Sequence, residues 1–209
     1  GDDFSHEGLK YFRAKSAHIA GIPVTAMRLS YVGELGWEIY TGAEYGAALW
    51  DLLAAAGQDH GIIPAGRIAF NSLRIEKGYR SWGSDMTVEH TPSAAGLDFA
   101  VRMDKTVDFV GKSALSAAQQ PTSMLRSIVF DDPDAAVLGS EPVFVAGGCA
   151  GYVTSAGHSP MLGRTIAYAW LPAAVGTGDV VTVDYRGTTY TAVVAAEPVV
   201  DPTMARIKR

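Results

Sequence analysis

The sequence has almost none of the features that mark secreted or membrane-inserted proteins. Its 209 residues include a single cysteine, Cys149, so no disulfide can form within the chain, and a reducing compartment is expected. The apolar stretches, such as 166–175, are too short to cross a bilayer. Acidic residues at Asp2, Asp3 and Glu7 stand where a signal peptide would carry its apolar core. We therefore predict a cytoplasmic protein with no membrane partner.

Positive charge and clustered metal ligands are also scarce. The chain has 17 Lys and Arg against 22 Asp and Glu, and this negative balance argues against nucleic acid as a partner. The five histidines are scattered and Cys149 is alone, so we predict no metal site. The glycines of 147–151 are wrongly spaced for a dinucleotide-binding motif, so no flavin or nicotinamide site is expected within this chain. A Ser-His-Asp site stays open, although no nucleophile-elbow motif indicates one.

The first block, 1–120, mixes strand and helix patterns. Alternating residues predict a strand over 22–32, followed by a tight turn at Gly33 and Gly36 and extended chain at 37–40. Apolar residues at helical spacing predict a helix over 45–57, with Gly57 as its left-handed C-cap. A second helix is expected from Pro64 to about Gly78. This block is expected to form the first domain.

The second block, 121–209, loses the helical pattern and is expected to form a second domain. Six short runs rich in Val, Thr and Tyr predict strands, at 127–130, 141–145, 151–154, 165–170, 180–185 and 189–194. Arg186 and Gly187 predict a hairpin turn between the last two. Closure removes exposed strand edges, so we predict a small six-stranded antiparallel β-barrel. The fold class is therefore α+β, a mixed strand-helix region followed by a barrel, with a polar linker at 116–123.

Distinctive motifs run through both blocks. They lie at 28–39, 65–80, 82–92, 96–99, 108–112, 139–142, 151–155, 166–172 and 197–198. In this order they resemble the glycine-cleavage T-protein family of folate-binding aminomethyltransferases. The run Glu-Lys-Gly-Tyr-Arg-Ser-Trp-Gly at 76–83 is most similar to the C-terminal folate regions of dimethylglycine oxidase and sarcosine dehydrogenase. The first block is accordingly expected to be a partial aminomethyltransferase folate-binding domain.

The resemblance implies a tetrahydrofolate site at Tyr31 and Glu38. The pterin presents an N–H and an amino group side by side, and one carboxylate can accept both with its two oxygens. The turn at Gly33 and Gly36 changes the chain direction, so both side chains can line one pocket. The residues alone also fit a purely structural interpretation, in which Tyr31 is a core aromatic and Glu38 a solvated strand residue.

Three further positions follow from the same resemblance. Phe99 occupies the place where T-proteins usually carry a tryptophan beside the folate, and an aromatic ring there can still stack on the ligand. Phe70 replaces the arginine that usually meets the acidic tail of folate, so Arg67, one helical turn earlier, is the candidate substitute. The charged residues at 74–80 are expected to form a solvated helix end.

The resemblance also implies a function for a larger parent protein. In relatives an N-terminal segment carries the catalytic aspartate and one wall of the folate pocket, and nothing here matches it. We therefore expect a chain that starts in mid-fold, has no assigned catalytic residue and is inactive without its missing N-terminal segment, flavin domain or subunit. In the parent, a separate domain holding FAD would oxidise dimethylglycine or sarcosine, and tetrahydrofolate would capture the carbon as 5,10-methylenetetrahydrofolate. Two alternatives stay open: a flavin-independent S-, O- or N-demethylase, and a non-catalytic folate-binding module.

Overall fold

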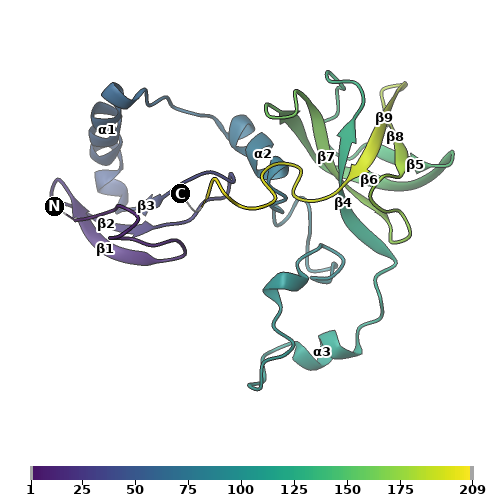
Figure 1. Ribbon diagram of the computed structural model, residues 1–209, viewed down its shortest axis with the longest axis horizontal. Coiled ribbons are helices and arrows are strands. Elements are labelled where there is room, and N and C mark those ends of the chain that lie inside the picture. Colours follow the sequence, from purple (N-terminus) through teal and green to yellow (C-terminus); the bar gives the residue numbers. More distant parts are fainter. Residues whose placement is uncertain (1, 208–209) are drawn as a thin grey trace. The chain divides into compact units, whose positions relative to one another are not determined.

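The structure is a computed structural model that describes residues 2–207. The chain divides into two compact units, and the division falls within one helix (Figure 1). Unit 1 consists of 1–74 together with 201–209, and unit 2 of 75–200. This division differs from the domain boundary at 120/121 that the change in sequence pattern predicts. That boundary stays a prediction about independently folding domains. None of the helices within 2–207 is long and apolar enough to cross a membrane.

Unit 2 contains a closed six-stranded antiparallel barrel, which confirms the predicted fold class. Its strands follow the order β4-β7-β6-β5-β8-β9 around the barrel. Their bounds are β4 Ser123–Phe130, β5 Pro142–Val145, β6 Gly148–Ser159, β7 Arg164–Pro172, β8 Val180–Tyr185 and β9 Thr188–Ala195. All six predicted strands are present, and β6 is longer at both ends than expected. The predicted hairpin is confirmed: Arg186 and Gly187 both have positive φ, 52° and 82°, as a type I′ turn requires.

The strand β7 is buried on both faces and joins two layers of core. Ala167, Ala169 and Leu171 point into the barrel, where they pack with residues such as Ile128 and Val143. The alternate residues, Ile166, Tyr168 and Trp170, pack with Ile75, Ala94, Ala95 and Leu125. The segment 75–97 therefore covers the outer face of the barrel at β7 and β4. Close packing extends to the backbone, since a Cβ at Gly151 would lie 1.8 Å from the carbonyl oxygen of Trp170.

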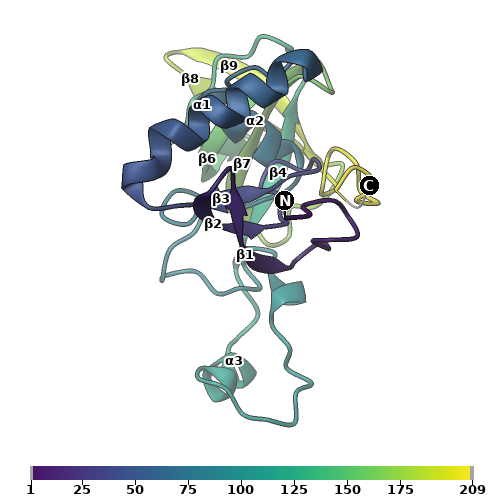
Figure 2. The ribbon, with the colours of Figure 1, turned by 90° about the vertical axis from the view of Figure 1, so that its left-hand side faces the viewer.

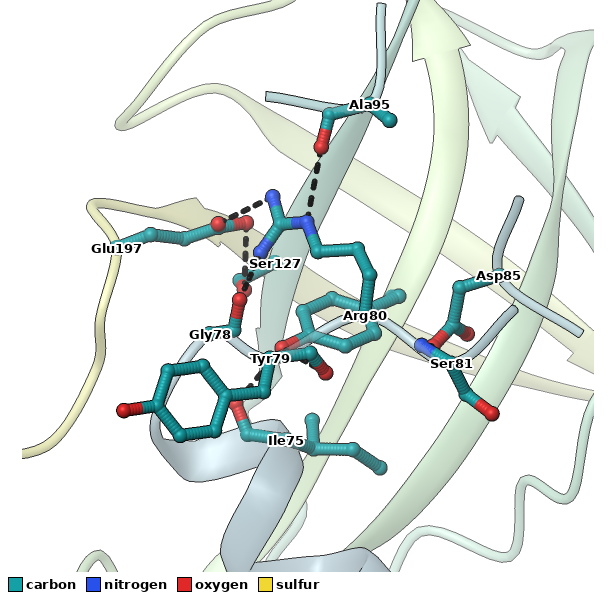
Figure 3. A network of polar contacts seen from close by, with 10 residues as sticks. Ile75, Gly78, Tyr79, Arg80, Ser81, Asp85, Ala95, Ser127 and Glu197 are labelled. Atoms are coloured by element: carbon teal, nitrogen blue, oxygen red, sulfur yellow. Dashed lines mark hydrogen bonds and ion pairs between the residues drawn. The ribbon is translucent and has the colours of Figure 1, made fainter. Parts of the chain in front are cut away.

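The charged residues at the end of the helix over 67–76 and just after it are buried, whereas a solvated helix end was expected. Arg74, Glu76, Lys77 and Arg80 are each at most 8% exposed. The Arg80 guanidinium donates to the carbonyls of Ala95 and Gly78 and forms an ion pair of 2.5 Å with Glu197 (Figure 3). The expectation was wrong because the folded chain supplies partners for these residues, such as the acceptors around Arg80 and the Ser159 hydroxyl that donates to Glu76, and a buried charge is tolerated when it is paired and hydrogen-bonded.

A long excursion leaves the barrel between 98 and 121. It contains a short 3-10 helix, η3 Asp98–Ala100, and one helix, α3 Lys112–Ala117, neither of which has a buried residue. Figure 1 shows this segment extending away from the barrel strands, and Val107 and Val110 on it are exposed. The helix α3 was not predicted, because six residues are too few to show a clear helical period.

Unit 1 contains a three-stranded antiparallel sheet in the order β1-β2-β3 with one helix packed on it (Figures 1 and 2). The strands are β1 Ala14–Ile19, β2 Ile22–Met27 and β3 Glu38–Tyr40. Two 3-10 helices, η1 Ala43–Tyr45 and η2 Gln58–His60, flank α1 Gly46–Gly57. The helix α2 Arg67–Glu76 follows, and its residues 67–74 belong to this unit. The packing is thin: Ala17, Ile22, Val24 and Leu49 make up its buried apolar cluster.

Three expectations for this unit need correction. The strand predicted over 22–32 ends at Met27, where the chain turns away from the sheet. The strand β1 was not predicted and pairs with β2 over its full length. Gly57 is right-handed, with φ −83°, and the left-handed cap is Gly61, with φ 71°, because α1 continues into η2 before the chain reverses.

Candidate functional site

Glu38 begins β3 and lies on the exposed face of the unit 1 sheet. It pairs with Met27 in the register that places Ala26 opposite Ile39, and Ala26 and Ile39 belong to the buried side. Because successive strand residues point to opposite faces, Glu38 and Tyr40 share the other face. The Tyr40 hydroxyl donates a hydrogen bond to Oε2 of Glu38, and this bond raises the pKa of Tyr40. The sheet therefore holds a carboxylate at its surface, oriented by a neighbouring hydroxyl.

Tyr31, Phe70 and Arg67 are brought together in the same unit. Tyr31 lies in the loop between β2 and β3, and its ring stacks on Phe70 with centroids 5.8 Å apart and an interplanar angle of 25°. The Arg67 guanidinium lies 5.4 Å from the Phe70 ring centroid, as the i, i+3 spacing on α2 allows. Two aromatic rings and one cation thus form a continuous stack. Tyr31 is half-buried, and its ring contact with Phe70 fits a packing role as well as a binding role.

The loop over 28–37 that links Tyr31 to Glu38 is compactly folded. Gly33 has φ 77°, and a Cβ at Gly36 would come within 3.0 Å of the Leu29 carbonyl oxygen. The Trp37 indole N–H donates to the carbonyl of Phe4 at 3.1 Å, and the buried Arg28 guanidinium lies 4.5 Å from the Trp37 ring. The two predicted glycines are therefore where the chain direction changes.

A contact from the far end of the chain also reaches this loop, and sequence reasoning missed it. Nη1 of Arg206 donates to Oε1 of Glu34 at 2.7 Å, across 172 positions of sequence. Glu34 lies within the family-like motif 28–39, between Tyr31 and Glu38. The one sequence feature that points to this contact is that the motif contains a second carboxylate.

Phe99 belongs to unit 2, on η3 at the start of the excursion. Its side chain is 81% exposed, so it does not serve the barrel core. A pocket of about 280 Å³ lies beside η3, lined by residues that include Thr91, Ser93, Asp98 and Gln119. An exposed phenylalanine at this place is available to stack on a planar ligand.

An open pocket of about 450 Å³ lies in unit 1 next to the hydrogen-bonded side chains of Glu38 and Tyr40. Tyr40, His18, Thr25 and Glu44 are among its lining residues. Tyr40 thus contributes to the wall of this pocket and also holds the Glu38 carboxylate. No group of three or more His, Cys, Asp or Glu side chains suited to a metal ion occurs within 2–207.

Comparisons with known families match both parts of the chain. Residues 1–105 match the family described as "GCVT N-terminal domain", and residues 124–201 match "Glycine cleavage T-protein C-terminal barrel domain". The structure is similar to a crystal structure of glycine cleavage system aminomethyltransferase T from Bartonella henselae. The TM-score is 0.78 with 26% sequence identity, over 93% of this chain and 54% of that one.

The chain is similar in sequence to two kinds of protein, amine dehydrogenases and aminomethyltransferases. Mitochondrial dimethylglycine dehydrogenase of Mus musculus is 37% identical over all of this chain and 24% of its own length. An aminomethyltransferase of Symbiobacterium thermophilum is 40% identical over 78% of this chain and 45% of its own length. Mitochondrial sarcosine dehydrogenase of Homo sapiens is 33% identical over 99% of this chain and 23% of its own length. The chain therefore spans about a quarter of the dehydrogenases and about half of the aminomethyltransferase.

Proposed function

This chain belongs to the glycine cleavage T-protein family, and we propose that it forms the tetrahydrofolate-binding part of an amine-oxidising one-carbon enzyme. Support for the amine-oxidising branch comes from the dimethylglycine and sarcosine dehydrogenases, which match the whole chain or nearly so. In such an enzyme a separate FAD domain oxidises a methylated amine such as dimethylglycine or sarcosine. Tetrahydrofolate takes up the released carbon and becomes 5,10-methylenetetrahydrofolate. We propose the cytoplasm as the compartment, on the basis of the single cysteine.

The observation that carries this proposal is the Glu38 carboxylate on the exposed sheet face. The pyrimidine edge of a pterin offers two adjacent donors, and a carboxylate accepts them with both oxygens. The hydrogen bond from Tyr40 leaves most of the acceptor capacity of the carboxylate available and fixes the side-chain direction. The residues present therefore fit the pyrimidine edge of the ligand.

The aromatic stack supplies the remaining parts of the proposed site. Tyr31 offers a hydroxyl and a ring, and Arg67 offers a permanent positive charge for the acidic tail of folate. Phe70 stands where relatives carry an arginine for that tail, and here it packs between Tyr31 and Arg67. We propose that Arg67 takes over the tail contact. Phe99 belongs to unit 2, and we propose it separately as a residue that stacks on a planar ligand. None of these residues is assigned a catalytic role.

We also propose that the exposed apolar side of α1 is covered by further parts of the family fold. A pocket of about 390 Å³ there is lined mostly by apolar residues, among them Trp50, Leu53, Ile62 and Ile63. Exposed apolar patches of this kind mark interaction surfaces. The Bartonella henselae aminomethyltransferase has nearly as much chain again beyond the portion that this chain matches, and the dehydrogenases have about three times as much. An N-terminal segment or flavin-bearing partner is the proposed occupant.

The experiment that tests the site is a calorimetric titration of tetrahydrofolate against Glu38→Gln. The amide keeps the shape but turns a donor toward a pterin donor and removes the charge, which costs about 2–3 kcal/mol, or roughly a 30- to 150-fold loss of affinity. Tyr31→Phe removes one hydroxyl and should cost about 0.5–1.5 kcal/mol. The matched control is Glu89→Gln, an exposed glutamate of unit 2.

Melting temperatures separate binding from folding. Both site variants should have the melting temperature of the unsubstituted chain if Glu38 and Tyr31 bind the ligand. A wild-type affinity in Glu38→Gln would remove Glu38 from the site and would contradict the proposal.

A further inference from the structure

We propose that the C-terminal segment 201–207 is a clamp that positions the Tyr31–Glu38 loop, with Arg206 as the positioning residue. This inference rests on the proposed function, because it concerns the same loop. The segment belongs to unit 1 although it follows the barrel in sequence. It ends in the pair between Arg206 and Glu34, with a 2.7 Å separation between Nη1 and Oε1.

The clamp is itself an ordered structure. The Asp201 carboxylate accepts the backbone N–H groups of Ala205 at 3.0 Å and Arg206 at 3.2 Å. The Met204 N–H bonds to the Asp201 carbonyl, which closes a tight turn. Ile207, next to Arg206, is buried. The turn and the buried isoleucine therefore hold the Arg206 backbone, so the guanidinium reaches Glu34 from a fixed base.

The position of Glu34 makes this contact relevant to binding. It stands three residues after Tyr31 and four before Glu38, within the 28–37 loop. Two other contacts also anchor the loop, Trp37 to Phe4 and Tyr31 to Phe70. Arg206 holds it from a segment that is far away in sequence. Fixing a loop in its binding conformation lowers the entropy lost on binding, so the pair favours the ligand without touching it.

The pair is partly exposed, so its effect is modest and depends on salt. The side chains of Arg206 and Glu34 are 30% and 43% exposed. Pairs of this kind contribute little to the free energy of unfolding of the whole chain. A contact with one loop acts mainly on the local stability of that loop. We therefore expect a local change in the loop and a small change in affinity, with the barrel unaffected.

The test compares Arg206→Gln, Glu34→Gln, the double variant and the charge swap Arg206→Glu with Glu34→Arg, in the full chain. Tetrahydrofolate affinity should fall about 2- to 5-fold in each single variant, no further in the double variant, and recover in the swap. Backbone amides of 28–37 should exchange faster in the single variants while those of β7 stay unchanged. The differences should shrink in 1 M salt. The matched control is Arg102→Gln, which breaks the exposed 2.8 Å pair with Asp104 in unit 2.

Each outcome decides between roles. Unchanged exchange in 28–37 or unchanged affinity overturns the clamp. A loss in Arg206→Gln that Glu34→Gln does not share would mean that Arg206 contacts the ligand directly, and this also overturns it. Glu38→Gln is titrated alongside: if it binds normally, the proposed site fails, while the exchange data still report whether 201–207 holds the loop. A chain that binds no tetrahydrofolate contradicts the proposed function, and the exchange data for 28–37 then decide whether 201–207 holds the loop.

Discussion

The two units solve the problem of burying apolar surface in different ways. In unit 2 the closed barrel encloses a continuous core, and the segment 75–97 adds a second layer outside β7. In unit 1 the sheet and α1 share a small cluster, while Trp50, Ile62 and Ile63 stay exposed. The barrel satisfies its own strand edges and core, whereas the described part of unit 1 leaves apolar surface exposed. Three of the four candidate binding residues, Tyr31, Glu38 and Arg67, belong to the thinly packed unit, whereas Phe99 belongs to unit 2.

This difference suggests a division of roles. A dense, closed barrel tolerates little internal change, because its side chains are packed at crystal-like density. A loosely packed sheet with an ordered surface loop can instead adapt to a ligand, since binding loops come from the less stable parts of a protein. We therefore expect substitutions in unit 2 to affect stability and substitutions in the 28–38 region to affect binding.

The largest expected difference comes from the same substitution in the two units. Ile128→Ala removes a side chain that is 0% exposed in the barrel core and should lower the free energy of unfolding by about 2–5 kcal/mol. Ile68→Ala acts on a residue that is 85% exposed and should change it by no more than about 0.5 kcal/mol. Urea unfolding of both variants measures the contrast. A large loss in Ile68→Ala would show that this surface is already covered in the isolated chain.

A smaller effect is expected at the buried polar network of unit 2. Asp85 is fully buried, and its carboxylate accepts hydrogen bonds from Ser155 at 2.6 Å, Thr154 at 2.7 Å and the backbone N–H of Ser81 at 2.7 Å. Asp85→Asn replaces one acceptor oxygen with a donor and should lower stability by about 1.5–3 kcal/mol. Asp98→Asn, at an exposed aspartate that accepts one long bond from Ser93, should be nearly neutral. Equal losses in the two would refute the importance of burial here.

Limited proteolysis tests whether 121–209 is a domain of its own. The predicted linker, 116–123, overlaps the end of α3 and the start of β4, and all of its residues but Pro121 are exposed. We expect the first cleavage between 116 and 123, leaving the barrel intact, as is usual for exposed segments with few packing contacts. Mass spectrometry of the early fragments identifies the site. A first cut within α1 would contradict the boundary at 120/121.

The smallest expected effect is the titration of Tyr40. The hydrogen bond to Glu38 raises the pKa of Tyr40 by favouring its neutral form. The resulting stabilisation is present below the ordinary pKa of tyrosine and is lost as the pH rises through the raised value. Glu38→Gln should move the pKa of Tyr40 back down toward the ordinary value. Ultraviolet difference absorbance across alkaline pH follows this shift, with Tyr40→Phe identifying the signal; an unchanged titration would show that the two side chains do not interact in solution.

The sequence by itself determined the features that depend on neighbouring residues. Runs rich in Val, Thr and Tyr, separated by turn residues, located all six barrel strands and the Arg186-Gly187 hairpin, because strand preference and turn conformation are local properties. Helical spacing located α1, and Pro64 and Gly78 bracketed α2, which forms within those limits at 67–76. The motifs identified the family and marked Tyr31 and Glu38 as candidates before any contact was known.

Only the tertiary structure decided what depends on distant segments. Burial of the Arg80 charge required acceptors on distant segments, Ala95 and Glu197, and a charge pattern alone is equally typical of a solvated helix end. Placing Arg67 and Tyr31 on one stack required the α2 helix to meet the loop after β2. The contact between Arg206 and Glu34 joins residues 172 positions apart. No local pattern encodes such a pair, because its partners become neighbours only when the rest of the chain has folded between them.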